Sequence, residues 1–253
     1  MSVTFAIITQ KGGVGKTTTV NALAASFKKL NKRILCVDMD PQGNLSFSTG
    51  ANTEDCLTIF DAISGTARVN TCIQKTEFTD ILPSNILLTG AELEFTGNNR
   101  EFILKNVLSV VEDDYDIILI DSPPGLGFLT INALSACNYV IIPMLPDIFS
   151  LQGLVQVYET IEFVKKATNP DLEVMGIVIN KYNKYSKLHR EAMGTAELIS
   201  KNLKIPIFGT CVRNTQKLAE AHSLQLDIFE YCPKCPGVKD YFKIANEILS
   251  KLN

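Results

Sequence analysis

A glycine-rich stretch near the start of the chain, TQKGGVGKTTT at residues 9–19, limits the possible folds more than any other feature. An apolar run precedes it and a segment of helical periodicity follows, so the stretch is expected to connect a β-strand to an α-helix. Its end fits the phosphate-loop pattern G-x-x-x-x-G-K-[ST], with Gly15, Lys16 and Thr17 in register. Gln10 stands where that pattern places its first glycine, and a Gly-Gly pair two residues later is expected to make the bend.

The loop has the chemistry needed to bind the phosphates of a nucleotide. Its small residues let successive backbone N–H groups turn toward phosphate oxygens, and the helix that begins near Lys16 adds the positive end of its dipole. Lys16 is expected to contact the β- and γ-phosphates, and the Thr17 hydroxyl is expected to ligate Mg²⁺. The alternative is a glycine-rich turn with lysines present by chance, which accounts for neither the strand before the loop nor the helix after it.

Short β-branched runs alternate along the chain with longer segments of helical periodicity. The expected strands are VTFAIIT, RILCVD, YDIILID, NYVIIP, EVMGIVIN and IFGTCV, and the expected helices cover residues 16–30, 100–112, 150–167, 187–203 and 238–251. Apolar strands separated by helices indicate an α/β fold with a mostly parallel central sheet and helices on both faces. No stretch has the composition of a linker, so one domain of the phosphate-loop NTPase type is expected over residues 1–253.

Composition restricts the compartment and the partners. No apolar run approaches the length of a membrane-spanning helix, and the first residues lack the basic region and cleavage site of a signal peptide, so a cytoplasmic protein is expected. The seven cysteines are scattered, most of them in apolar segments, which is typical of reduced thiols. A formal net charge of −3 excludes a uniformly basic protein but leaves room for a local basic surface.

Acidic residues follow two further expected strands. In parallel sheets ligands bind at the carboxyl ends of the strands, which would place these residues beside the glycine-rich loop. Asp121, at the end of YDIILID, is expected to hold Mg²⁺ together with the Thr17 hydroxyl. Asp38 and Asp40, in VDMDPQGN, end another strand. One of the two is expected to support the metal through water, and the other to orient a water molecule for attack on the γ-phosphate.

Three motifs in this order, KGGVGKTT, DMDPQGN and DSPPGLG, resemble those of the ParA/Soj family of partition ATPases, which shares a deviant phosphate loop with MinD and the nitrogenase iron protein. The resemblance covers nearly the whole chain and includes LTINALSACNYVIIPMLPDIFSLQGL and VRNTQKLAEAHS. It implies a switch ATPase of chromosome or plasmid partitioning that binds ATP and Mg²⁺. It also implies that two subunits dimerise around two ATP molecules and that a ParB-like protein stimulates hydrolysis.

The resemblance assigns roles to individual residues. Lys11 matches the signature lysine that crosses to the phosphates of the partner subunit, and a cation supplied in trans is a known accelerator of phosphoryl transfer. Asp40 matches the aspartate that positions the attacking water, and Asp121 matches the metal aspartate, which leaves Asp38 to support the metal. The loop matches the family's phosphate and Mg²⁺ site at Gly12, Gly13, Val14, Gly15, Lys16, Thr17 and Thr18.

The resemblance also places the base. Asn180, in VINKYN, stands where family members use a strand-end amide or similar group against adenine, and an amide can both donate to and accept from the edge of that base. Arg213 and Asn214 lie in the segment that closes over the base.

A basic segment is expected to bind DNA without sequence preference in the ATP dimer. Residues 181–217 hold eight lysines and arginines against two glutamates, an excess of six positive charges, and ParA-like proteins use basic residues in this part of the chain. The alternative is a solvated basic face. Arg213 and Lys217 rank first because they lie in a segment that resembles the family, and the remaining candidates are Lys184, Lys187 and Arg190. Nucleoid association in the ATP state would follow.

Two kinds of binding are not expected. The chain reaches its first expected strand at once, so no operator-reading domain is expected before it. The final helix, in FKIANEILSKLN, is not followed by a basic amphipathic tail, so MinD-like attachment to membranes is not expected.

One motif departs from the family. EYCPKCPG places Cys232 and Cys235 in a C-x-x-C pair where partition ATPases usually have residues resembling Y-D-P-x-S. Mrp-type iron–sulfur carriers also have a cysteine pair, but theirs follows the strand with the adenine-contacting asparagine, where this chain reads NKYNKYSK. An iron–sulfur carrier is therefore one alternative function, and a ParA-like protein that positions a protein cargo is another.

Overall fold

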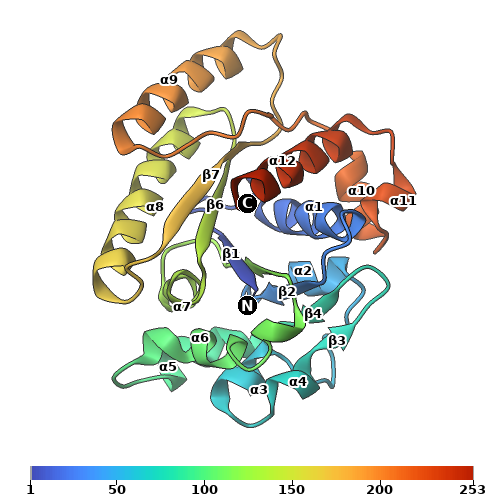
Figure 1. Ribbon diagram of the computed structural model, residues 1–253, viewed down its shortest axis with the longest axis vertical. Helices are drawn as coiled ribbons and strands as arrows, with labels where there is room; N and C mark the ends of the chain where they lie inside the picture. Colours follow the sequence, from blue (N-terminus) through green and yellow to red (C-terminus); the bar gives the residue numbers. More distant parts are fainter. Residues whose placement is uncertain (1, 253) are drawn as a thin grey trace.

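A computed structural model describes residues 2–252 of the 253-residue chain. Its centre is a seven-stranded sheet in the order β3-β4-β2-β5-β1-β6-β7 (Figure 1). Every neighbouring pair is parallel except β3 and β4, which are antiparallel at one edge. The strands are β1 (Val3–Ile7), β2 (Ile34–Asp38), β3 (Gln74–Lys75), β4 (Asp80–Leu82), β5 (Ile117–Asp121), β6 (Tyr139–Met144) and β7 (Glu173–Ile179).

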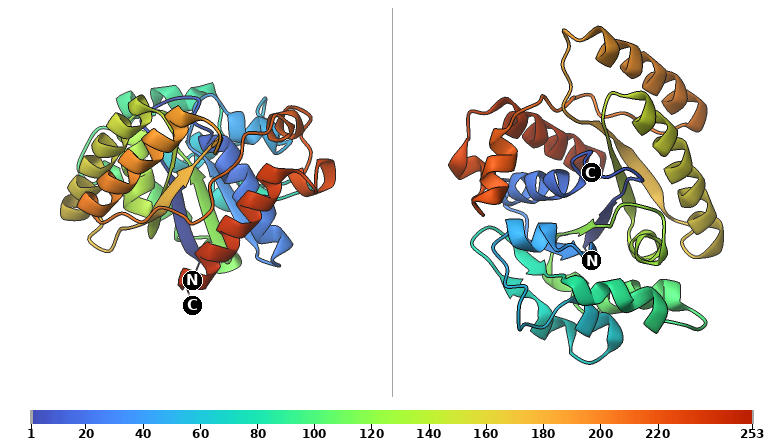
Figure 2. Two further views of the ribbon diagram at one scale, coloured as in Figure 1. Left: turned by 90° about the horizontal axis from the view of Figure 1, so that it is seen from above. Right: turned by 180° about the vertical axis from the view of Figure 1, so that it is seen from behind.

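Helices cover both faces of the sheet and enclose two hydrophobic cores (Figures 1 and 2). The helices of one face are α1 (Lys16–Lys29), α2 (Asn44–Ser48), α10 (Lys217–Ser223), α11 (Ile228–Tyr231) and α12 (Pro236–Leu252). Those of the other face are α3 (Ile59–Ser64), α4 (Val69–Cys72), α5 (Ala91–Glu94), α6 (Ile103–Leu108), α7 (Phe128–Ala136), α8 (Ile148–Ala167) and α9 (Lys187–Leu203). Short 3₁₀ helices are η1 (Ile86–Gly90), η2 (Arg100–Phe102) and η3 (Glu112–Asp114).

The apolar strands fill both cores at once. In β1, Phe5 and Ile7 point into the core beneath α1 and α12, whereas Ala6 points into the opposite core. All three side chains are fully buried, because successive residues of a strand face opposite sides of the sheet. The expectation of a mostly parallel sheet between two helical layers is confirmed. Among residues 2–252, no helix combines the length and the apolar character needed to cross a membrane.

Two expected elements differ from the structure. The segment IFGTCV, residues 207–212, forms one isolated bridge, at Ile207, and is not a strand, and a second isolated bridge follows it at Arg213. Its Gly209 N–H donates to the Glu247 carboxylate of α12 rather than to β7, and Pro206 has no N–H to donate, so a continuous ladder cannot form. The helix expected over 100–112 divides into η2, α6 and a turn. The edge strands β3 and β4 and helix α7 were not expected.

The sheet brings the polar strand ends together. Ile7 of β1 pairs with Asp121 of β5, and Asp121 pairs in turn with Asp38 of β2. The carboxyl ends of three adjacent strands therefore meet at one edge, directly beside the loop that leads into α1.

Candidate nucleotide-binding site

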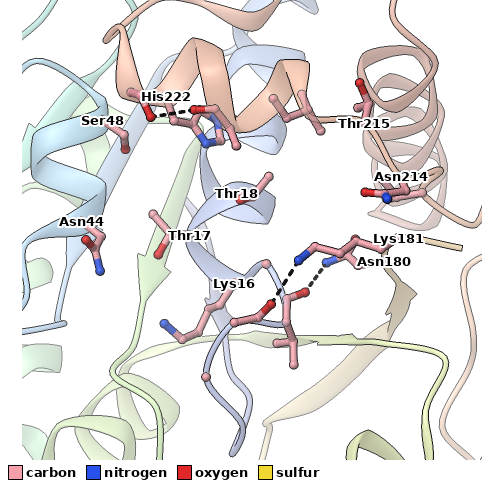
Figure 3. Close-up of a pocket in the computed structure, with 18 of the residues that line it drawn as sticks. Lys16, Thr17, Thr18, Asn44, Ser48, Asn180, Lys181, Asn214, Thr215 and His222 are labelled. Carbon is pink, nitrogen blue, oxygen red and sulfur yellow. Dashed lines mark hydrogen bonds between the residues drawn. The ribbon is translucent and has the colours of Figure 1, made fainter.

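A cavity of about 660 Å³ opens at the carboxyl edge of the sheet. The loop of residues 11–18 forms its floor, and Asp40, Asn180 and the segment 212–215 line its sides. Figure 3 shows the side chains of α2, α10 and the loop after β7 around the same space. Its volume suits a nucleotide, since small-molecule sites commonly measure about 300–1,000 Å³.

Two loop residues adopt left-handed conformations that favour glycine. Gly13 has φ +77° and Gly15 has φ +92°. A Cβ at Gly15 would also lie 3.0 Å from the Asn180 Nδ2 atom, so the loop approaches the end of β7 closely. Gly15 is the N-cap of α1 and has no side chain with which to cap it. The first N–H groups of the helix are thus left for a ligand, and their partial positive charge favours an anion.

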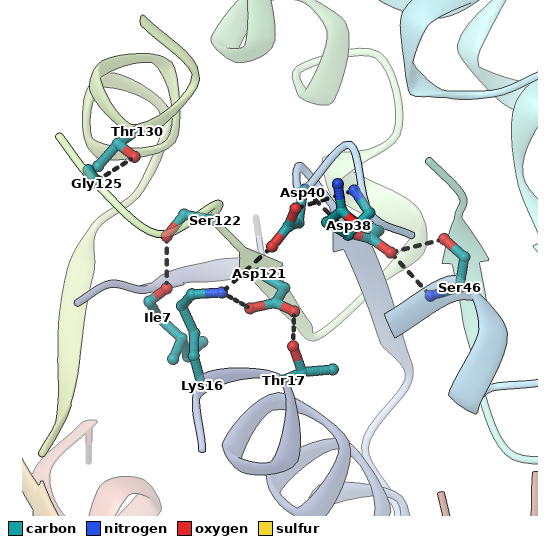
Figure 4. Close-up of polar contacts among 11 residues, drawn as sticks. Ile7, Lys16, Thr17, Asp38, Asp40, Ser46, Asp121, Ser122, Gly125 and Thr130 are labelled. Atoms are coloured by element: carbon teal, nitrogen blue, oxygen red, sulfur yellow. Dashed lines mark hydrogen bonds and ion pairs between the residues drawn. The ribbon is translucent and has the colours of Figure 1, made fainter. Parts of the chain in front are cut away.

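Lys16 and Thr17 both reach the buried Asp121 carboxylate (Figure 4). The Lys16 Nζ atom lies 3.1 Å from one Asp121 oxygen, and the Thr17 hydroxyl donates to the other at 2.6 Å. Burial raises the pKa of Asp121, and the charge of Lys16 opposes that rise. The structure thus brings together the residues that the sequence predicts for the phosphates and the metal.

Asp38 and Asp40 have different surroundings although only one residue separates them. Asp40 lines the cavity, and one of its oxygens lies 3.9 Å from the Lys16 Nζ atom. Asp38 is fully buried and accepts three hydrogen bonds, from the Asp40 N–H and from the N–H and hydroxyl of Ser46. Burial raises the pKa of Asp38 to about 7, and the charge of Asp121 adds to the effect. The role of Asp38 in supporting the metal stays a prediction. The hydrogen bonds that Asp38 accepts stabilise the turn that carries Asp40.

The donor set fits a magnesium ion. Thr17, Asp40 and Asp121 offer hydroxyl and carboxylate oxygens, which are the ligands that Mg²⁺ prefers. Two of these donors, Asp40 and Asp121, are carboxylates, and both lie beside the single positive charge of Lys16. A divalent cation would balance the remaining negative charge.

Asn180 holds the loop in addition to lining the cavity. Its Nδ2 atom donates to the Val14 carbonyl at 3.0 Å and to the Thr19 hydroxyl at 3.3 Å. Its Oδ1 atom accepts from the fully buried Tyr241 hydroxyl of α12 at 3.0 Å, and that hydroxyl also meets Thr19 Oγ1 at 2.9 Å. The adenine contact expected of Asn180 stays a prediction, and contact with a base would compete with these bonds. The sequence analysis missed Thr19 and Tyr241.

Replacing Tyr241 with phenylalanine is expected to weaken both the fold and the loop. The change removes the donor to the buried Asn180 oxygen and one of the contacts of the Thr19 hydroxyl, at a cost of about 1–2 kcal/mol in the free energy of unfolding. The melting temperature should fall by a few degrees, and the affinity for nucleotide should fall with it. Phe242→Leu, a change at the neighbouring position outside this network, is the control for affinity. Unaltered affinity in Tyr241→Phe would contradict the role of the network.

Lys11 also lines the cavity, and its side chain is more exposed than that of Lys16. Its Nζ atom lies 3.4 Å from the Asp147 carboxylate and 5.2 Å from the centre of the Phe149 ring. The side chain is 40% exposed, and the adjacent Ile148 and Phe149 are 65% and 66% exposed. Lys16, in contrast, is almost fully buried at the site. The two lysines of the loop therefore differ in burial and in ion-pair partner, Asp147 for Lys11 and Asp121 for Lys16.

The residues that the sequence predicts beside the base line the cavity, and their contact with a base stays a prediction. Arg213 and Asn214 are among the lining residues. Lys181 and His222, which the sequence analysis did not assign to the nucleotide, line the cavity as well (Figure 3), and Lys181 donates to the Gly13 carbonyl of the loop at 3.4 Å. Arg213 is fixed by Asp240 of α12, which accepts bonds from its Nη2 at 2.7 Å and its Nε at 2.9 Å. Lys181 could have been predicted from the sequence, because it directly follows the strand-end Asn180. No motif around His222 indicates that it lines the cavity.

The fold and the site together define a phosphate-loop nucleoside triphosphatase with a mostly parallel sheet. A family model described as an AAA domain matches residues 2–174. The chromosome-partitioning ATPase Soj of Treponema pallidum is 37% identical over 254 residues, covering 99% of this chain and 98% of that protein. The sporulation initiation inhibitor protein Soj of Bacillus subtilis is 37% identical over 249 residues, covering 96% of each.

A solved structure has a similar fold over the full length of this chain. Cobyrinic acid a,c-diamide synthase from Mycobacterium smegmatis, with a bound ATP analogue and magnesium, has a TM-score of 0.89 and 29% identity, covering 100% of this chain and 96% of that one. The chain belongs to the ParA/Soj family of partition ATPases. The family expected from the sequence is thereby confirmed. The expected nucleotide and metal agree with those in this neighbour, which carries an ATP analogue and magnesium.

Proposed function

We propose that this protein is an ATP-dependent switch of chromosome or plasmid partitioning, active as a homodimer that binds DNA without sequence preference. The observation that carries the proposal is the separation of the two loop lysines, Lys16 inside the cavity and Lys11 on its rim. One subunit thus has a phosphate loop with its own buried lysine and a second, more exposed lysine that pairs with Asp147, which supports a role for Lys11 outside its own site. Like its Soj relatives, the protein would turn over ATP as part of partitioning.

The residues of one chain would divide the work of hydrolysis. The loop N–H groups and Lys16 bind the β- and γ-phosphates, and Thr17 with Asp121 holds magnesium. When bound, the magnesium neutralises charge on the phosphate oxygens. Asp40 orients the attacking water, and the hydrogen bonds to Asp38 fix the turn that carries Asp40.

Dimerisation would join two such cavities face to face. Ile148 and Phe149 are exposed directly beside Lys11, which supports a protein contact at this rim because exposed apolar clusters commonly mark interfaces. In the dimer, Lys11 would leave Asp147 and reach the phosphates of the partner subunit. A ParB-like protein would then accelerate hydrolysis and so release the DNA.

The basic residues proposed for DNA lie at the carboxyl edge of the sheet in two groups. Lys184 and the α9 residues Lys187 and Arg190 are exposed. Lys187 has only a 3.7 Å contact with Glu191, a weak surface pair. Arg213 and Lys217 are more tightly engaged, with Asp240 at 2.7 Å and Glu220 at 2.6 Å. The first group therefore has more free charge for phosphates, which reverses the ranking made from the sequence.

Removing the exposed group tests the DNA proposal. The triple change Lys184→Ala, Lys187→Ala and Arg190→Ala is expected to abolish ATP-dependent retention on arbitrary duplex DNA at moderate salt. If all three contact phosphates, the slope of log affinity against log salt should fall by about 3. ATP-driven dimerisation, followed by light scattering, should persist.

The matched control is the pair Lys28→Ala and Lys29→Ala. These exposed lysines end α1, at the opposite edge of the sheet from the nucleotide loop. Their removal takes away two positive charges, against three in the triple variant, and should leave retention intact. Equal retention by the triple variant and the natural chain would remove these residues from the DNA surface.

Two other functions are less well supported. An iron–sulfur carrier needs several thiolates, and among residues 2–252 no group of three or more His, Cys, Asp or Glu side chains is placed to hold a metal. A positioning protein for a protein cargo would share the ATP switch. Retention on DNA with ATP, lost with ADP and at high salt, favours partitioning over both.

A further inference from the structure

Cys232 and Cys235 lie across one tight turn that connects α11 to α12. The Cys235 N–H donates to the Cys232 carbonyl at 2.9 Å, which closes the turn, and the Cys232 N–H donates to Ile228 of α11 at 3.0 Å. The Cys235 carbonyl accepts from Lys239, in the first turn of α12. A β-turn of this kind brings its outer Cα atoms within about 7 Å, close to the separation of about 4.4–6.8 Å that a disulfide requires.

The two thiols differ in accessibility. Both are free, and Cys232 is only 8% exposed within the core beneath α1 and α12, whereas Cys235 is partly exposed. Burial, followed by a hydrogen bond with the Cys235 thiol, raises the pKa of Cys232 to about 12. Cys235 is the more accessible of the two thiols, so an incoming oxidant would react with Cys235 first.

The turn is packed against one wall of the nucleotide cavity. A Cβ at Gly237, two residues after Cys235, would lie 2.7 Å from the Thr215 Cγ2 atom, so α12 and the segment that lines the cavity are in tight contact. One turn later, Asp240 holds Arg213 by its backbone N–H and its guanidinium. A displacement at the start of α12 would reach both residues of the wall.

The other side of the turn leads to α10. Tyr231, directly before Cys232, donates from its hydroxyl to Glu220 at 2.8 Å, and Glu220 pairs with Lys217. Helix α10 carries His222, which lines the cavity opposite the phosphate loop. The cysteine turn thus connects two elements that line the same cavity.

We propose that Cys232 and Cys235 form a reversible dithiol–disulfide pair that controls nucleotide affinity. Cys235 thiolate attacks a low-molecular-weight disulfide such as oxidised glutathione, which releases one glutathione thiolate and leaves a mixed disulfide. The released glutathione thiolate takes the proton of the Cys232 thiol, and Cys232 then attacks the Cys235 sulfur, forms the internal disulfide and releases the second glutathione as a thiolate, which takes up the proton that Cys235 lost. The cysteine pair loses two electrons and two protons, and the oxidant gains them. Closing the bond pulls the start of α12 and loosens the wall at residues 213–215.

The test has two independent readouts on the full chain. Oxidised glutathione should convert the protein to a form lighter by two hydrogens, with Cys232 and Cys235 linked in a proteolytic digest and restored by dithiothreitol. The affinity for a fluorescent ATP analogue should fall by about fivefold or more on oxidation and recover on reduction. The second readout rests on the proposed nucleotide site, whereas the first does not, so failure of either proposal is recognised separately.

Two serine variants complete the experiment. Cys235→Ser keeps a good helix N-cap residue and should fold, yet lose both the disulfide and the change in affinity. Cys56→Ser, at a half-buried cysteine outside the cavity lining, should behave as the natural chain does. Absence of the internal disulfide, metal bound to the isolated protein through these thiols, or a disulfide that leaves affinity unchanged would each overturn the proposal.

Discussion

Replacing Lys11 with alanine is expected to lower the stimulated rate of ATP hydrolysis by about a thousandfold or more, because a cation supplied in trans contributes about that much to phosphoryl transfer. Binding of ATP by the single subunit should change little, since Lys16 and the loop N–H groups remain in place. The measurements are hydrolysis in the presence of DNA and partner protein, and nucleotide affinity under conditions that keep the protein monomeric. The ATP-dependent dimer should weaken as well.

A mixture of two inactive variants distinguishes action in trans from action in cis. Lys11→Ala retains Asp40, and Asp40→Ala retains Lys11, so a mixed dimer contains one complete site if Lys11 crosses to its partner. In a symmetric dimer, an equal mixture should then recover about a quarter of the natural rate. No recovery would place Lys11 at its own phosphates and contradict the dimer mechanism.

Asp147→Asn tests whether the ion pair with Asp147 restrains Lys11 in the single subunit. Asparagine keeps the cap at the start of α8, where Asp147 accepts from the Ser150 N–H, but removes the negative charge beside Lys11. The variant would break the ion pair but keep the Lys11 side chain available to the partner subunit. Hydrolysis should therefore be maintained or rise, whereas Lys11→Ala abolishes it.

The phosphate end of the site could be predicted from the sequence because its residues stand in local motifs at the carboxyl ends of adjacent parallel strands. Lys16 and Thr17 are fixed by the loop that precedes them. Asp121 ends a strand that pairs in register with β1, so its place beside the loop follows once the sheet is assumed to be parallel. The same reasoning brought Asp38 and Asp40 to this edge.

The far wall of the cavity depends on contacts between distant parts of the chain. Asn180 is held by Tyr241, and Arg213 by Asp240, both on the last helix. Neither partner is marked by a local motif, because an apolar helix with one buried tyrosine looks like any core helix. The segment IFGTCV has the composition of a strand, yet its middle bonds to Glu247 rather than to β7. Contacts with α12 therefore determine both the positions of Asn180 and Arg213 and the irregular backbone of IFGTCV.

Replacing Asp40 with alanine is expected to leave ATP binding and ATP-dependent dimerisation in place while hydrolysis falls by about a hundredfold or more, the usual effect of losing a positioned base. Asp40 lines the cavity, but its nearest cation, Lys16, is held more closely by Asp121 at 3.1 Å than by Asp40 at 3.9 Å. Loss of Asp40 thus leaves the phosphate contacts intact. Hydrolysis, light scattering with ATP and nucleotide affinity are measured together.

Asparagine at the same position separates the chemistry of the carboxylate from its structural contact. One Asp40 oxygen accepts from the Gln42 N–H at 3.0 Å, and an amide oxygen can keep that bond. An amide cannot accept a proton from the attacking water. If Asp40 acts on that water, Asp40→Asn and Asp40→Ala should be equally slow and equally dimeric. If Asp40 only shapes the turn, Asp40→Asn should restore hydrolysis, and a monomeric Asp40→Ala protein in ATP would contradict the proposed order of dimerisation before hydrolysis.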